Sequence, residues 1–157
     1  MTHSEETERM ADQLRRVIAG PAWLGPSMLE LLDDVPPASA ASRPVADAHS
    51  IWELVLHTAA WLEIVERRLG GERPQVTADV NFPPVLDTSA TAWRRTLDGL
   101  RAATDRLTTR VGTLSPADFD RELPGDDATY TVYTTVHGAI QHVAYHAGQI
   151  AILKRAR

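Results

Sequence analysis

The sequence of 157 residues contains no cysteine. Disulfide bonds, zinc–thiolate sites and a protein thiol nucleophile are therefore excluded, and the composition fits a reducing compartment such as the cytoplasm. Any thiol chemistry would have to use a thiol carried by a small molecule. No run of about 18 apolar residues occurs either, so the sequence predicts no membrane-spanning helix. The first ten residues, MTHSEETERM, are polar and acidic and argue against a signal peptide.

An excess of basic charge is also missing. The chain has 16 Lys and Arg against 21 Asp and Glu, which gives a formal net charge of -5. Proteins that bind nucleic acids present a basic face to the phosphates, so we expect no nucleic-acid partner. The length is that of one domain, and a chain of this size buries roughly 68–70% of its unfolded surface without help from disulfides. We therefore expect a single domain over residues 1–157.

Proline spacing divides the chain into four long segments. The ten prolines leave proline-free windows at 1–20, 45–73, 85–115 and 125–157. Because proline interrupts helix interiors, these windows predict four main helices. Loops are expected between them, at 34–48, 70–86 and 114–129. Residues 21–33 predict a short extra helical segment after the first helix, and no alternation typical of β-strands is present.

Apolar residues in three of these windows recur at helical spacing. They are Ile51, Val55, Thr58, Leu62, Val65 and Leu69; Trp93, Leu97, Leu100, Thr104, Leu107 and Val111; and Val132, Val136, Ala139, Val143, His146, Ile150 and Leu153. Ser50 is a plausible N-cap before the second window, and Gly70 a plausible stop after it. Apolar faces of this kind need partner helices, so the sequence predicts an all-α four-helix bundle.

One position in the last apolar face is occupied by a histidine. His146 lies among aliphatic residues, and His142 lies only about 40° around the helix from it. The same spacing is used in helical zinc sites, where a third ligand comes from another element. His57 is the candidate, because it lies on the flank of the second helix in a row with Leu54 and Trp61. Three histidines would leave an open coordination position, as catalytic zinc sites do. The alternative is that these are core histidines bonded to their neighbours.

Four other side chains close in sequence to these histidines each have two possible roles. Glu53 precedes His57 by four residues and could accept the second ring N–H of that histidine, or could be a solvated carboxylate. Gln149 could bond a metal-bound water, or could make an ordinary contact between helices. Trp61 and Tyr145 could line a pocket or belong to the core.

Three further histidines are not expected to be ligands. His137 projects about 180° from His146 on an ideal helix. His3 lies near the N-terminus, where the helix end is expected to fray. His49 directly precedes the second helix, where a capping or supporting role is expected.

Three stretches of the sequence resemble the DinB-like superfamily. They are GPAWLGPSMLELL at 20–32, AHSIWELVLHTAAW at 48–61 and HVAYHAGQIAILKRA at 142–156. Together they span nearly the whole chain. The resemblance implies a four-helix bundle with an unusual connection order, and it implies a homodimer, since relatives often form one.

The resemblance also implies a divalent metal held by three histidines, which map onto His57, His142 and His146. Several similar proteins are transferases or isomerases that use a low-molecular-weight thiol such as bacillithiol or mycothiol, and others have no assigned reaction. The shared stretches cover the metal site and leave the substrate open.

Our hypothesis from the sequence is a metal-dependent enzyme that acts on a small molecule. The ion, Zn²⁺ or Ni²⁺, would lower the pKa of a bound water for hydrolysis, or would activate an incoming thiolate for S-transfer. The alternative is a metal- or ligand-binding bundle without enzymatic activity. A third reading is a metal-free interaction module.

Overall fold

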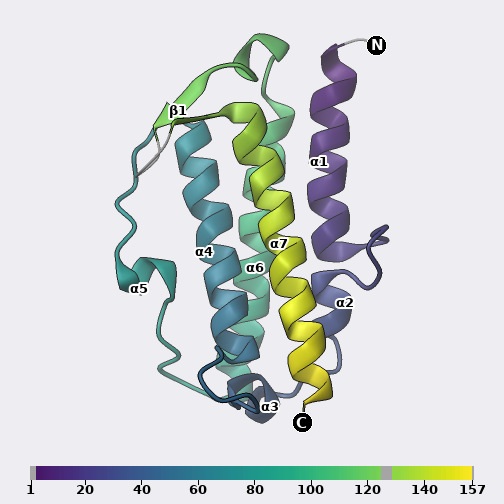
Figure 1. Ribbon diagram of the computed structural model, residues 1–157, viewed down its shortest axis with the longest axis vertical. Coiled ribbons are helices and arrows are strands. Elements are labelled where there is room, and N and C mark those ends of the chain that lie inside the picture. The colour runs from purple at the N-terminus through teal and green to yellow at the C-terminus, as the bar shows by residue number, and fades with distance from the viewer. Residues whose placement is uncertain (1–2, 125–128, 157) are drawn as a thin grey trace.

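Four long helices account for most of the computed structural model, which describes residues 3–124 and 129–156. They are α1 (His3–Ala19), α4 (Ile51–Leu69), α6 (Ala90–Gly112) and α7 (Val132–Arg155), and they form a bundle (Figure 1). The predicted all-α four-helix fold is confirmed. Across the described residues, we find no helix that combines the length and the apolar character needed to cross a bilayer.

The helices are not arranged in chain order around the bundle. Helix α1 packs against α6 and α7, and α4 also packs against α6 and α7, so that α1 and α4 lie on one diagonal. In Figure 1, α1 and α7 run downward while α4 and α6 run upward. Each helix therefore has one parallel neighbour. Periodicity alone did not predict this order of helices. The order agrees with the unusual connection that the family resemblance implied.

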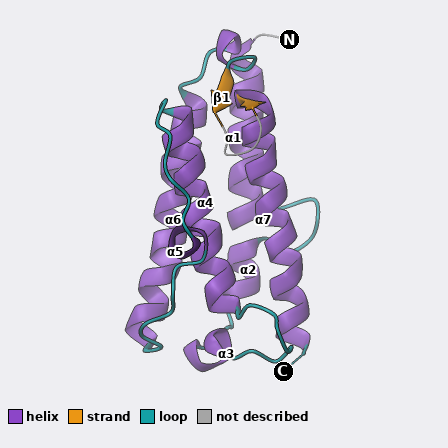
Figure 2. Ribbon diagram, turned by 60° about the vertical axis from the view of Figure 1, so that its left-hand side comes forward, coloured by secondary structure: helices purple, strands orange, loops and turns teal. Residues whose placement is uncertain are grey.

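A parallel pair of neighbouring helices forces the chain to travel back along the bundle between them. Residues 70–89 make this return, and we call them the crossover (Figures 1 and 2). The crossover contains the single-turn helix α5 (Ala78–Asn81), which packs on α4 and begins at the N-cap residue Thr77. The loop expected at 70–86 thus contains a helix. Four residues are too few to show a helical period in a sequence.

Further short elements lie in the segments between the long helices. They are α2 (Met28–Leu32), α3 (Pro37–Ala41), the 3₁₀ turn η1 (Pro116–Asp118), and the antiparallel strands β1 (Glu122–Pro124) and β2 (Thr129–Thr131). The extra helical segment expected over 21–33 is shorter than predicted and coincides with α2. Within the loop expected at 114–129, residues 125–128 lie outside the described part of the chain. The missed elements have three to five residues, so none repeats its period.

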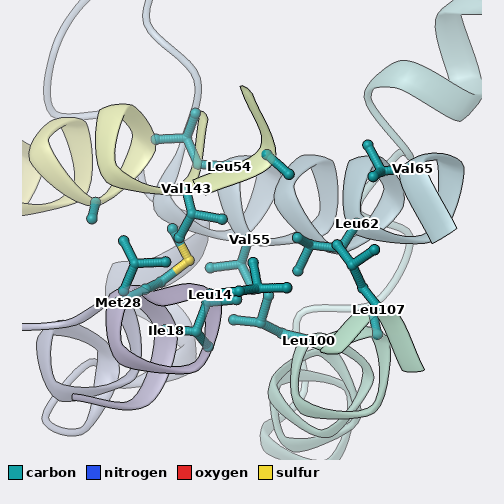
Figure 3. Close-up of a cluster of buried hydrophobic side chains, with 14 of the residues drawn as sticks. Leu14, Ile18, Met28, Leu54, Val55, Leu62, Val65, Leu100, Leu107 and Val143 are labelled. Carbon is teal, nitrogen blue, oxygen red and sulfur yellow. The ribbon is translucent and has the colours of Figure 1, made fainter. Parts of the chain in front are cut away.

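The predicted apolar faces form the core. Nearly all of their residues are buried, and Leu97 alone among them is only partly so. Figure 3 shows Leu14 of α1, Val55 of α4 and Leu100 of α6 meeting at the centre of this core. His146 belongs to the buried face of α7, as its spacing predicted.

The start of α4 is fixed by a capping box. Ser50 Oγ accepts a hydrogen bond from the backbone N–H of Glu53 at 3.2 Å, and the Glu53 carboxylate accepts the backbone N–H of Ser50 at 2.7 Å. This cap sets where the first turn begins and hence which way His57 points two turns later.

We predict that Ser50→Ala lowers the free energy of unfolding by about 1 kcal/mol, because the backbone N–H of Glu53 loses its acceptor, Ser50 Oγ. Urea denaturation measures the change. Ser42→Ala, at an exposed serine, is the control and should stay within about 0.5 kcal/mol of the parent protein. Equal stability of the parent and Ser50→Ala would contradict the capping role.

Candidate metal centre

The structure brings His57, His142 and His146 together between α4 and α7. The Nε2 atom of His142 lies 3.0 Å from Nε2 of His57 and 3.0 Å from Nε2 of His146. The ligand atoms of all three residues lie within 4.8 Å of one another. His57 and His146 are buried, and His142 is half-buried. The three histidines selected from helical spacing in the sequence therefore converge on one site.

Two of the rings are held by hydrogen bonds on their far side. His57 Nδ1 lies 2.5 Å from the backbone oxygen of Asn81, and His146 Nδ1 lies 2.6 Å from the side-chain oxygen of Gln149. Both oxygens are acceptors, so each Nδ1 carries the proton and donates it. In a neutral imidazole this leaves Nε2 with its lone pair. His57 and His146 thus aim lone pairs toward the cluster.

This arrangement suits a cation. His142 Nε2 can donate a proton to at most one of its two Nε2 neighbours, so the lone pair of the other neighbour has no hydrogen to accept across its 3.0 Å contact. A divalent ion accepts a lone pair from each ring instead. With zinc–nitrogen bonds of about 2.0–2.1 Å, a tetrahedral site separates its nitrogens by about 3.3 Å, close to the 3.0 Å between His142 Nε2 and each of the other two Nε2 atoms. The donor set therefore fits a divalent metal.

Burial keeps the three rings neutral. It is the largest cause that lowers the pKa of each, and in His142 burial together with the neighbouring charges of His146 and His57 lowers the pKa to about 4. In His57 and His146, burial lowers the pKa while the hydrogen bonds to Asn81 and Gln149 partly oppose it. Metal ligation requires neutral imidazole, which is the form that these pKa shifts favour near pH 7.

Two residues of the crossover complete the surroundings of His57 and were missed in the sequence. Asn81 accepts the indole N–H of Trp61 on its side-chain oxygen at 2.8 Å, besides bonding His57 through its backbone. The ring of Phe82 stacks on His57, with centroids 4.0 Å apart. The N-cap residue Thr77 followed by Pro83 could have indicated a short helix here, but nothing in the sequence relates it to α4.

Of the two roles left open for Glu53, the hydrogen bond to His57 is not the one that the structure shows. The Glu53 carboxylate caps α4 and pairs with Arg43, and the Nδ1 of His57 is taken by Asn81. A carboxylate one turn before His57 faces the N-terminus of its own helix, where the helix dipole and free N–H groups favour it.

Gln149 has a role that differs from both roles left open for it. Its side-chain oxygen accepts a hydrogen bond from the ring of His146 on the same helix. Tyr145 is largely exposed, and its ring lies edge-on to His146 with centroids 5.2 Å apart. Trp61 is partly buried, and its centroid lies 5.8 Å from that of His142.

Two of the three histidines that were not expected as ligands, His137 and His49, lie outside the cluster. His137 packs against Tyr133, with ring centroids 4.4 Å apart. His49 stacks on Phe82 at 3.9 Å, on the opposite side from the cluster. Its Nδ1 lies 3.8 Å from the Glu53 carboxylate.

Two cavities border the cluster. The first, of about 550 Å³, is lined by His57 and His142 together with Trp61. The second, of about 460 Å³, is lined by His146 and Gln149. Small molecules of ordinary ligand size fit volumes in this range. The imidazoles are thus within reach of molecules that occupy either cavity.

A bundle with these histidines can be compared with known proteins. A family model described as the DinB superfamily matches residues 25–150. The chain belongs to the DinB superfamily. Among solved structures, a conserved protein from Enterococcus faecalis superimposes with a TM-score of 0.70 and 15% identity, covering 99% of this chain and 97% of that one. At this identity the likeness concerns the fold alone. No curated protein matches the DinB chain described here.

We predict that the metal-free protein loses stability as the pH falls from about 6.5 to about 4. The folded-state pKa of His142 is about 4, against 6.5 for the unperturbed group, so the unfolded chain takes up the proton first. Protons therefore favour unfolding below pH 6.5, and this contribution saturates near pH 4. Denaturation at a series of pH values measures it.

Carboxylates titrate at the lower end of the same range, so a variant isolates the histidine contribution. His142→Asn removes one ring and relieves its neighbours, and its stability should depend less on pH between 6.5 and 5 than that of the parent. Parallel pH profiles for the two proteins would contradict the assignment.

Proposed function

We propose that His57, His142 and His146 bind a divalent metal ion and that the chain is a metal-dependent enzyme for small-molecule substrates. The observation that carries this proposal is the convergence of three neutral Nε2 atoms at a point bordered by a cavity. Membership of the DinB superfamily supports it. Zn²⁺ and Ni²⁺ are the metals that we favour, since both accept imidazole nitrogen.

The ligand set leaves room for substrate. Within the described residues, the cluster contains three histidines and no further Asp, Glu or His. Sites with three protein ligands are typical of catalytic metals, whereas structural sites are closed by a fourth. When bound, the ion supplies Lewis acidity at the open position.

The protein's own residues fix the rings and shape the surroundings. The carbonyl of Asn81 and the amide of Gln149 hold the tautomers of His57 and His146, as hydrogen bonds behind metal ligands commonly do. Trp61 and the aliphatic side chains of Leu62 and Val65 line the first cavity. They would bind the apolar part of a substrate and exclude water from the rings.

Two reactions suit such a site. One is S-transfer, in which a small thiol attacks an electrophilic substrate, and the other is hydrolysis. The absence of cysteine leaves no protein thiol to compete for the ion. A screen of the metal-loaded protein against small thiols combined with electrophilic acceptors tests the first, and a screen against esters and amides without thiol tests the second. A non-enzymatic metal-binding bundle remains if neither gives turnover.

We predict that His146→Ala abolishes metal binding while His137→Ala leaves it intact. The two histidines lie on the same helix, but His146 alone belongs to the cluster. Elemental analysis should give close to one ion per chain for the parent and for His137→Ala, and zinc at about 100 times its Kd should stabilise both by about 2.7 kcal/mol. Equal losses in the two variants would refute the site.

A second variant tests the bond behind His146. We predict that Gln149→Leu weakens zinc affinity about tenfold to a hundredfold, because the ring loses the acceptor that fixes its tautomer. Gln141→Leu is the matched control, since Gln141 is exposed on the same helix. The zinc affinity of this variant should equal that of the parent protein. Competition with a chromophoric chelator measures both. Unaltered affinity in Gln149→Leu would show that the bond does not support ligation.

A further inference from the structure

The first cavity extends along the bundle from the histidine cluster toward the end where α4 finishes and α7 begins, at the top of Figure 1. His57 and His142 line it at the cluster. Thr135, about two turns before His142 on α7, lines it at the far end. Arg68, which follows His57 by eleven residues on α4, also lines the far end. A molecule in this cavity therefore lies between the imidazoles and the side chain of Arg68.

Trp61 lies between the two ends. The Cζ atom of Arg68 lies over the indole, 5.8 Å from the ring centroid, which is within the range of a cation–π contact. The same ring lies 5.8 Å, centroid to centroid, from the ring of His142. His57, Trp61 and Arg68 lie within about 40° of one another around α4, so they form a row along the helix. A small molecule that covers the indole thus reaches both the guanidinium and the cluster.

The permanent charge in the wall of this cavity is positive. Among the described residues that line the cavity, Arg68 carries such a charge and none is Asp or Glu. Arginine stays protonated over the whole pH range in which proteins are studied. The chain as a whole has a formal net charge of -5, so the positive wall is a local feature. The cavity therefore favours an anionic ligand.

Two of the hydroxyl groups at the far end are already committed. Thr134 Oγ1 donates to the backbone oxygen of Thr131 at 3.0 Å, and Thr135 Oγ1 donates to the same oxygen at 2.8 Å. Each hydroxyl has one hydrogen, so neither threonine donates to a ligand in this arrangement. The guanidinium of Arg68 has five N–H donors. It can bind a carboxylate through two of them while it keeps its interactions within the protein.

We propose that the first cavity binds a small carboxylic acid, with the carboxylate on Arg68 and the apolar body on the indole of Trp61. A planar carboxylate matches the fork of the guanidinium through two parallel hydrogen bonds. Leu62, Val65 and Ala139 surround an uncharged body. The inference rests on the proposed function for the other end of the molecule, where the reactive group faces the metal. It names the substrate class as organic acids and Arg68 as the residue that selects them.

Two probes of nearly equal shape test the proposal. 3-Phenylpropionate carries the carboxylate, and 3-phenylpropionamide replaces it with a neutral amide. In metal-free protein at pH 8 the imidazoles are neutral, so Arg68 is the cation available among the described lining residues. Titration of the Trp61 indole N–H resonance, identified by its loss in Trp61→Phe, locates both probes and measures both Kd values. The acid should bind at least about tenfold more tightly than the amide.

Matched variants assign this preference to Arg68. Arg68→Gln removes the charge and keeps a hydrogen-bonding side chain, so the two Kd values should agree within about twofold. Arg67→Gln is the control, because Arg67 is exposed on the same helix, pairs with Glu72 and does not line the cavity. This control should retain the preference of the parent. The comparison of the two probes in the parent protein remains decisive if Arg68→Gln fails to fold.

Four results would each overturn the proposal. They are equal Kd values in the parent protein, a preference that persists in Arg68→Gln, an equal loss in Arg67→Gln, and a Trp61 resonance that neither probe shifts. The third would indicate a general effect of charge, and the fourth would place the probes outside the cavity.

The same titrations in zinc-loaded protein separate this inference from the proposed function. A preference for the acid that requires zinc and persists in Arg68→Gln places the carboxylate on the metal, which refutes the role of Arg68 alone. A preference that depends on Arg68 in a protein that fails to bind zinc refutes the metal site alone.

Discussion

The hydrogen bond between His57 and the backbone of Asn81 links the chemistry of the cluster to the topology of the bundle. It exists because α4 and α6 are parallel neighbours, which obliges the crossover to pass along the outside of α4. A bundle with antiparallel neighbours would join these helices by a short turn at one end and leave His57 uncovered. The tautomer of His57 and the position of Phe82 both depend on that passage.

The buried imidazoles also shape the energetics of the core. A position such as 146, between Val143 and Ile150 on the buried face of α7, would be occupied by an aliphatic residue if stability alone mattered. Burial disfavours the charged ring, and the proximity of three such rings adds to the effect, so the cluster opposes folding in acid. Preferential binding of an ion to the folded state acts in the opposite direction. The proposed function thus supplies a reason for a feature that packing does not explain.

Much of the fold and the identity of the clustered histidines could be predicted from the sequence. The period of 3.6 residues placed His146 on the buried face of α7 and His57 on the flank of the apolar face of α4, because helix geometry converts spacing directly into angle. Contacts between distant segments could not be obtained in this way. Asn81 and Phe82 reach His57 through the path of the crossover, and a one-turn helix has no period by which to recognise it. The spacing of Glu53 from His57 also suited a hydrogen bond between them, but the N-terminal turn of α4 supplies partners for Glu53 that spacing alone does not reveal.

The way in which the crossover is anchored determines where its sequence and length can vary. Asn81 accepts hydrogen bonds from His57 on its backbone oxygen and from Trp61 on its side-chain oxygen, and Phe82 stacks on His57. The chain before Asn81 and after Phe82 can therefore change length or composition without moving an imidazole. Loop exchange on both flanks could alter the cavity entrances while the nitrogen geometry persists. A scaffold of this kind lends itself to new specificities by grafting, with the anchoring dipeptide Asn81–Phe82 retained as the fixed point.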